Sequence, residues 1–124
     1  MRETANQYDP GRDLGKGTTV GTLIYGPHNA EYEFDDRLLA HLRVVIVTKF
    51  RRRESFTFTW ELHRESGGGR VSLWLDPSIP LQFHFRGSRE PSLNREWIEQ
   101  LATIAGTTTG LVPLDEPAPS HPAK

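Results

Sequence analysis

The stretch DDRLLAHLRVVIVTKFRRR, from Asp35 to Arg53, decides how this chain folds. At about 100° per residue its apolar side chains fall on one wide stripe, as expected for a helix that packs on a core. That stripe consists of Leu38, Leu39, Leu42, Val45, Ile46 and Phe50. Asp35 or Asp36 can cap the start of such a helix. By propensity alone, the β-branched run from Val44 to Val47 favours a strand instead.

Strand patterns flank this predicted helix on both sides. Before it, residues 22–25 and 30–34 are separated by a Gly-Pro-His-Asn turn and predict a hairpin. After it, apolar and polar side chains alternate in residues 56–61, 70–75 and 81–86. We expect these three segments to form an antiparallel meander with one apolar face.

A second helix is predicted to begin at Asn94, a good N-cap, and to end at Gly106. Leu111 and Val112 are expected to add a short edge strand. The order is therefore hairpin, helix, three strands, helix and short strand. We predict an α+β fold with two layers, in which both helices cover one face of a mostly antiparallel sheet.

The length of 124 residues allows one domain, and the glycines near the N-terminus and the prolines near the C-terminus suggest its limits. Residues 1–20 mix polar residues and glycine without periodicity, and we interpret them as a flexible N-terminal extension. Residues 21–113 are predicted to form the compact domain. The proline-rich residues 114–124 are predicted to be a disordered tail.

Composition excludes several classes of function. The chain has no cysteine, so it has no disulfide, thiolate nucleophile or thiolate metal site. The formal net charge of −1 gives no global attraction to nucleic acid or to an anionic membrane. No apolar run is long enough for a signal peptide or a membrane span, and we predict a cytoplasmic protein without a membrane partner.

Five segments of the predicted domain resemble those of a small actinobacterial family. They are TLIYG (22–26), EFDDRLLAHL (33–42), ESFTFTW (54–60), WLDPSIPLQF (74–83) and LNREWIEQL (93–101). Members of that family are commonly catalogued as ATP-dependent DNA ligases and elsewhere as a domain of unknown function. The resemblance implies one compact domain, and the ligase label implies an association with DNA.

The ligase chemistry itself finds no support in this chain. ATP-dependent ligases form their adenylated intermediate on the lysine of a Lys-x-Asp-Gly motif. The lysines here stand in Lys16-Gly-Thr-Thr, in Lys49-Phe-Arg-Arg and at the terminal Lys124. The five histidines lack metal-binding helical spacing, and no Gly-x-Ser-x-Gly elbow is present. We therefore predict no catalytic residue, no metal and no cofactor, although an enzyme site assembled only by folding leaves no such signature.

Two groups of side chains are candidates for binding. Arg51, Arg52 and Arg53 can hold phosphates, because guanidinium groups match phosphate oxygens in bidentate fashion. The simpler interpretation is that these cations complement the C-terminal end of the helix dipole.

The second group lies on the outer face of the predicted meander. There, Trp74 can stack on an aromatic ligand while Arg70, His84 and Arg86 hold an anion. The alternative is that Trp74 packs under the first hairpin or in a homodimer contact. We predict a small, non-catalytic binding or interaction module that uses this face. The alternative is a DNA-associated accessory protein that contacts phosphates through Arg51, Arg52 and Arg53.

Overall fold

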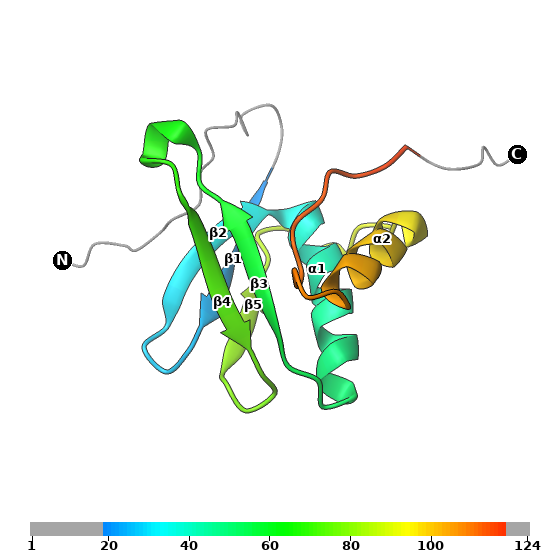
Figure 1. Cartoon of the computed structure of the whole chain (residues 1–124). Coiled ribbons are helices and arrows are strands. Elements are labelled where there is room, and N and C mark those ends of the chain that lie inside the picture. The colour runs from blue at the N-terminus through cyan, green and yellow to red at the C-terminus, as the bar shows by residue number, and fades with distance from the viewer. Residues whose placement is uncertain (1–18, 119–124) are drawn as a thin grey trace, which may run out of the picture.

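A computed structural model describes residues 19–118 of the chain (Figure 1). The α+β class predicted from the sequence is confirmed, with two helices and two antiparallel sheets. The elements in chain order are β1 (Val20–Tyr25), β2 (Ala30–Asp35), α1 (Asp36–Arg51), β3 (Phe56–Glu61), the short 3-10 helix η1 (Arg64–Ser66), β4 (Arg70–Leu75), β5 (Leu81–His84) and α2 (Arg95–Ala105).

The strands form one sheet of three and one sheet of two. In the larger sheet β1 is central, with β2 on one side and β5 on the other, and both pairings are antiparallel. The smaller sheet is the β3–β4 hairpin, in which Phe58 faces Leu73 across the ladder. Leu111 adds a single parallel bridge to Phe58 where we predicted a short edge strand.

The prediction of a β3–β4–β5 meander is wrong at its last strand. β5 leaves β4 and pairs with β1, so that Leu23 faces Phe83. The connection between β4 and β5 holds two prolines and is longer than the two-residue turns that keep consecutive strands paired. Its end is fixed elsewhere, because the Gly26 N–H donates to the Pro80 carbonyl at 2.9 Å.

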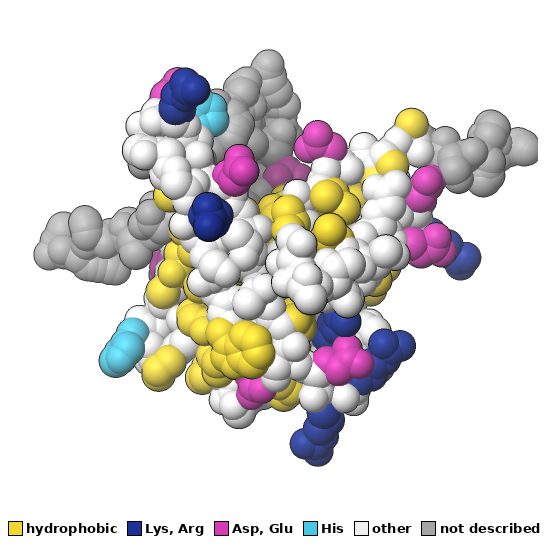
Figure 2. Space-filling model, in the orientation of Figure 1, with side chains coloured by type: hydrophobic (Ala, Val, Ile, Leu, Met, Phe, Trp, Pro, Cys, Tyr) yellow, Lys and Arg dark blue, Asp and Glu magenta, His cyan; other side chains and the backbone are white. Residues whose placement is uncertain are grey.

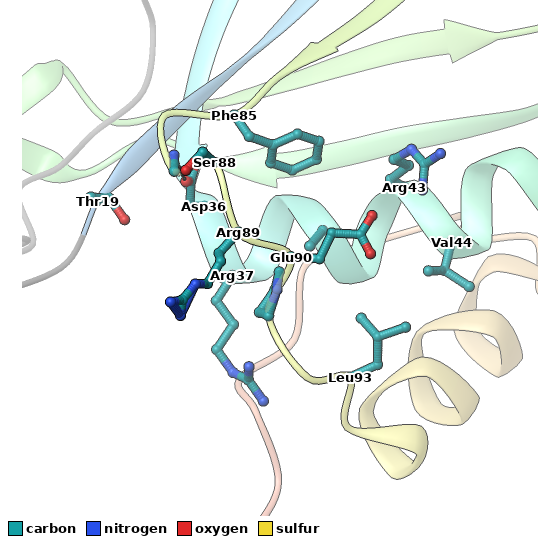
Figure 3. Close-up of a pocket in the computed structure, with 13 residues that line it drawn as sticks. Thr19, Asp36, Arg37, Arg43, Val44, Phe85, Ser88, Arg89, Glu90 and Leu93 are labelled. Carbon is teal, nitrogen blue, oxygen red and sulfur yellow. Dashed lines mark hydrogen bonds between the residues drawn. The ribbon is translucent and has the colours of Figure 1, made fainter.

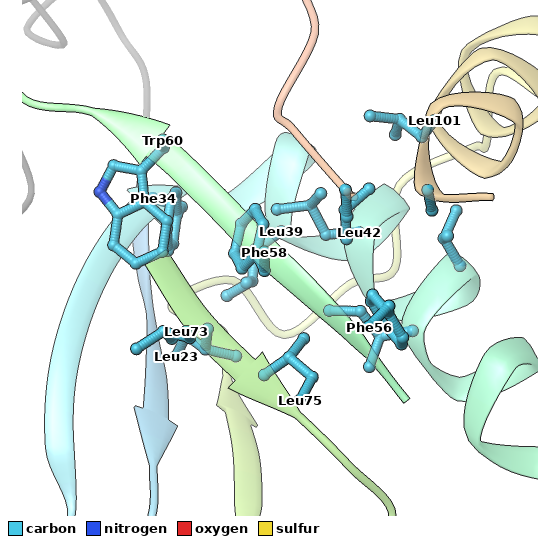
Figure 4. Close-up of a cluster of buried hydrophobic side chains, with 14 of the residues drawn as sticks. Leu23, Phe34, Leu39, Leu42, Phe56, Phe58, Trp60, Leu73, Leu75 and Leu101 are labelled. Atoms are coloured by element: carbon cyan, nitrogen blue, oxygen red, sulfur yellow. The ribbon is translucent and has the colours of Figure 1, made fainter. Parts of the chain in front are cut away.

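The hydrophobic core lies between the two sheets and the helices (Figure 4). Phe34 of β2 packs edge-on against Trp60 of β3, with ring centroids 5.0 Å apart, and also contacts Phe58. Leu39 and Leu42 of α1 and Leu101 of α2 are fully buried. The apolar face of β3 and β4 is therefore covered partly by the other sheet, whereas we predicted that helices alone would cover it.

Both helices begin at the predicted caps. The Asp35 side chain accepts a hydrogen bond from the Leu38 N–H at 3.1 Å, and the Asn94 side chain accepts one from the Trp97 N–H at 3.2 Å. Helix α1 runs through the β-branched segment, because its apolar stripe is buried: Leu39, Leu42, Val45 and Ile46 all belong to the core. Packing thus outweighs the strand propensity of that segment.

The chain after α2 stays attached to the helices as far as Pro117. The Trp97 indole N–H donates to the Leu114 carbonyl at 2.8 Å, and Glu116 forms a bidentate pair with Arg37, both N···O distances being 2.8 Å. These residues belong to the segment for which we predicted a disordered tail. Residues 119–124 of that predicted tail, and 1–18 of the predicted extension, lie outside the described residues.

Candidate functional site

Trp74 stands on the outer face of the β3–β4 hairpin with 53% of its surface exposed. Strand β4 alternates, so that Leu73 and Leu75 are buried in the core while Trp74 points the other way. Its partner across the ladder is Thr57. The Trp74 backbone is fixed from behind, because the Tyr25 hydroxyl donates to the Trp74 carbonyl at 2.7 Å.

A groove of about 360 Å³ runs from Trp74 to the C-terminal ends of both helices. We call it the Trp74 groove. Its lining residues come from the end of α1, the start of β3, β4 and the turn after α2: Lys49, Glu54, Ser55, Phe56, Thr57, Trp74, Ala105, Gly106, Thr107, Thr108 and Gly110.

The turn after α2 forms one wall of this groove, and backbone hydrogen bonds hold it there. The Leu111 N–H donates to the Thr57 carbonyl at 2.8 Å, and the Thr59 N–H donates to the Leu111 carbonyl at 3.0 Å. Gly110 has a positive φ of 84°, and a Cβ there would collide with Thr57. Only glycine lets the turn approach β3 so closely.

The opposite wall carries a pair of opposite charges. Lys49 Nζ lies 3.1 Å from Glu54 Oε1, and the Lys49 side chain is only 16% exposed. The same ammonium lies 5.9 Å from the centroid of the Phe56 ring. Lys49 thus lays its methylenes on the core and keeps its charge at the groove, as expected for a long cationic side chain at the end of an apolar stripe.

The turn that follows β4 fixes the floor of the groove near Trp74. The Ser55 hydroxyl donates to the Asp76 carboxylate, which also accepts the Ser78 N–H at 2.9 Å. These hydrogen bonds lower the pKa of Asp76, and the bond from the Ser55 hydroxyl makes the largest contribution. The carboxylate therefore stays ionised and ties the start of β3 to the end of β4.

Arg51, Arg52 and Arg53 lie beside this wall, directly before Glu54 in the chain, and all three are exposed. Arg51 ends α1 and Arg52 is its C-cap. Arg52 Nη1 is 4.0 Å from Glu54 Oε2, while Arg51 and Arg53 make no ion pair with any residue in the range 19–118.

Figure 2 shows this side of the molecule. A hydrophobic patch lies over the lower ends of β3 and β4, and a group of Lys and Arg side chains lies beside the C-terminal end of α1. An exposed aromatic surface and a cationic rim therefore share one face. Such a combination can stack a flat ring and attract an anionic group that is attached to it.

Comparison with protein families identifies a match that spans residues 20–116, almost the whole described region. The chain belongs to DUF7882, a domain family of unknown function. No curated protein and no solved structure matches it.

The DUF7882 fold separates the other residues that we predicted for the outer face. Arg70 is exposed at the far end of β4, opposite Glu61 and four residues from Trp74. His84 lies in the other sheet, where it pairs with Thr22 of β1, and Arg86 follows it in a loop. The structure therefore places Trp74 in one groove with Lys49 and Glu54, the residues that flank the three arginines in the chain, and it does not bring Trp74 together with His84 or Arg86.

Alternation alone placed His84 beside Trp74, because we assumed that β5 continues the meander. The turn that completes the Trp74 groove was not predicted at all. Gly110 is its one visible signal, since a glycine between a run of three threonines and a leucine suggests a close approach. Within residues 19–118 no three metal-binding side chains gather into a cluster, and neither helix has the length and apolar content to cross a bilayer.

Proposed function

We propose that this domain is a small, non-catalytic cytoplasmic binding module whose ligand-contacting surface is the Trp74 groove. The observation that carries the proposal is the exposed Trp74 ring at one end of a preformed groove. Burial of that ring by a ligand would remove a large apolar area from water, which is how aromatic residues dominate binding surfaces.

The charges in the groove favour binding over catalysis. Lys49 and Glu54 are its ionisable lining residues, and they are paired with each other at 3.1 Å. Each charge is therefore already engaged by the other, and neither is left free to act on a bound molecule. The remaining polar lining groups are hydroxyls and backbone, which hydrogen-bond a ligand without reacting.

The test is fluorescence of Trp74. Trp60 and Trp97 are buried, so a ligand in the groove is expected to change mainly the emission of Trp74. We expect an emission shift on adding a short single-stranded oligonucleotide, and no shift in the Trp74→Phe variant. A shift that depends only on protein concentration would assign the groove to self-association. Unchanged emission under all these conditions would contradict the proposal.

A second candidate function is association with DNA through phosphate contacts, in keeping with the ligase label of similar proteins. Arg51, Arg52 and Arg53 favour it, because their guanidinium groups are exposed and largely unpaired on the same face as Trp74. Phosphates bound there would lie beside a ring on which a base can stack.

This second candidate is tested by its dependence on salt. Replacing Arg51, Arg52 and Arg53 by Gln removes up to three phosphate contacts. For a single strand the slope of log K against log salt should then become shallower by about 2, since each contact contributes about 0.7. A matched variant with Arg64, Arg89 and Arg95 changed to Gln has the same net charge and should keep the slope. Equal slopes in the two variants would reject the contact.

A further inference from the structure

A second hollow, separate from the Trp74 groove, lies between α1 and the loop that joins β5 to α2 (Figure 3). Its volume is about 460 Å³, within the range of roughly 300–1,000 Å³ that is usual for sites of small molecules. We call it the α1 cleft. None of the site residues predicted from the sequence lines it.

The loop over this cleft is fastened to α1 at both ends. At one end, the Asp36 carboxylate accepts the N–H groups of Arg86 and Gly87, at 3.1 Å and 2.9 Å. At the other end, Arg37 Nη1 donates to the Ser92 carbonyl at 2.9 Å, and His41 Nε2 accepts the Asn94 N–H at 2.8 Å. The loop is thus held at a fixed height above the helix, and the cleft exists before any ligand binds.

One side of the cleft is apolar. Ala40 and Val44 stand one turn apart on α1, and the small side chain of Ala40 leaves space at the floor. Phe85 and Leu93 close the two ends, and Leu93 keeps 51% of its surface exposed. Val44 lies outside the core stripe of α1, so a bound apolar group would cover a helix face that is otherwise only partly shielded.

Two opposite charges face this apolar surface without pairing. Figure 3 shows the Glu90 carboxylate on the same side of the loop as Arg43, Val44 and Leu93, while Arg89 and Thr19 lie on the other side. Among residues 19–118, neither Arg43 nor Glu90 makes a hydrogen bond or an ion pair. Two of the other charged lining residues are engaged, Arg37 with Glu116 and Asp36 with the two backbone N–H groups, and the third, Arg89, lies on the side of the loop away from Glu90.

We propose that the α1 cleft binds a small zwitterion with an apolar body, of which a free amino acid with a hydrophobic side chain is the simplest example. Arg43 takes the carboxylate, for which a guanidinium is the matching donor. Glu90 takes the ammonium. The side chain of the ligand fills the space over Ala40, between Phe85 and Leu93. This site does not depend on the function proposed for the Trp74 groove.

The test is titration of the ¹⁵N-labelled full chain with L-phenylalanine and L-leucine, followed by amide chemical shifts. We expect the amides of Ser88, Arg89 and Glu90 to move while that of Trp74 stays in place. N-acetyl-L-phenylalanine, which lacks the cation, and phenethylamine, which lacks the anion, should each bind at least tenfold more weakly. Equal binding of either analogue, or shifts at Trp74 alone, would overturn the proposal.

Three variants separate the contributions of charge and space. Arg43→Gln and Glu90→Gln change exposed side chains and should each weaken L-phenylalanine binding at least tenfold, whereas Arg95→Gln, which changes an arginine outside the cleft, should not. Ala40→Leu fills the floor and should abolish binding with both charges intact. The dispersion of the amide spectrum shows whether each variant is folded. Absence of any shift in the folded wild-type chain at millimolar amino acid would also overturn the proposal.

Discussion

At the scale of single residues, His41 is a buried polar side chain whose two ring nitrogens both have partners. It is fully buried between the two helices, with its ring centroid 4.5 Å from that of Trp97. Nδ1 lies 2.8 Å from the Arg37 carbonyl, which can only accept, so Nδ1 carries the proton. Nε2 accepts the Asn94 N–H and has no proton. Both ring nitrogens are therefore satisfied only in the neutral form.

This arrangement predicts a loss of stability in mild acid. Burial, the largest cause, lowers the pKa of His41 below its ordinary value of 6.5. As the pH falls, His41 takes up its proton in the unfolded chain before it does so in the folded protein. The free energy of unfolding should therefore have its highest value above pH 6.5 and decrease below that pH. The fall is limited to about 1.4 kcal/mol per pH unit, the value for one proton.

Urea unfolding at pH 7.5, 6.5 and 5.5 measures this effect. His28→Gln, which changes an exposed turn residue, should leave the pH dependence as it is. His41→Gln should be less stable at pH 7.5 and should flatten the dependence between pH 6.5 and 5.5. A wild-type stability that is constant over this range would show that His41 is not held neutral.

At the scale of elements, the C-terminal end of α1 depends on the backbone conformation of Arg53. The Glu54 N–H donates to the Lys49 carbonyl at 3.0 Å, and the Arg53 N–H donates to the Phe50 carbonyl at 2.9 Å. These two bonds make a Schellman motif, in which the residue after the cap is usually glycine. Here it is Arg53, with φ 61°. The end of the helix therefore holds a cation in a conformation that disfavours any side chain.

Replacement of Arg53 by glycine should relieve this strain. We expect Arg53→Gly to raise the free energy of unfolding by roughly 0.5 to 1 kcal/mol, because glycine adopts a positive φ without steric cost. Arg51→Gly, which changes the last residue of α1, should lower the free energy of unfolding by a similar amount. Thermal unfolding of the two variants beside the wild type provides the comparison. A destabilised Arg53→Gly would mean that the arginine side chain makes a compensating contribution to the fold.

Local patterns sufficed for the elements themselves. Helix α1, both N-caps and the alternation of β3 and β4 could be predicted, because each depends on residues close together in the chain. The partner of β5 could not, since its alternation fits β1 as well as β4, and the choice depends on how the turn before it contacts Gly26. Strand alternation specifies a face and leaves the neighbour open.

At the scale of the whole molecule, the candidate sites depend on contacts that no local pattern contains. Trp74 could be placed on an outer face from alternation alone. Its meeting with the turn at Gly110 depends on the bridge between Leu111 and Phe58, which are far apart in sequence. The α1 cleft depends likewise on Asp36, which has the appearance of a capping residue and instead holds the loop after β5.

The same long-range closure ties the C-terminal segment to the first helix. Hydrogen bonds from Arg37, and then from Asn94, lower the pKa of Glu116 to about 2, although burial opposes the shift. This carboxylate keeps its charge in any ordinary buffer. The contact therefore persists under the conditions in which His41 becomes protonated, and the two groups titrate in separate ranges of pH.

The position of β5 beside β1 also has a consequence for how the protein is made. Thr22 of β1 pairs with His84 of β5, so the central strand lacks one neighbour until most of the domain has left the ribosome. The hairpin of β1 and β2 meanwhile presents an open edge, the kind of surface on which nascent chains join one another. Synthesis that stalls within α1, β3 or β4 would release a chain with that edge uncovered, ready to recruit a second copy.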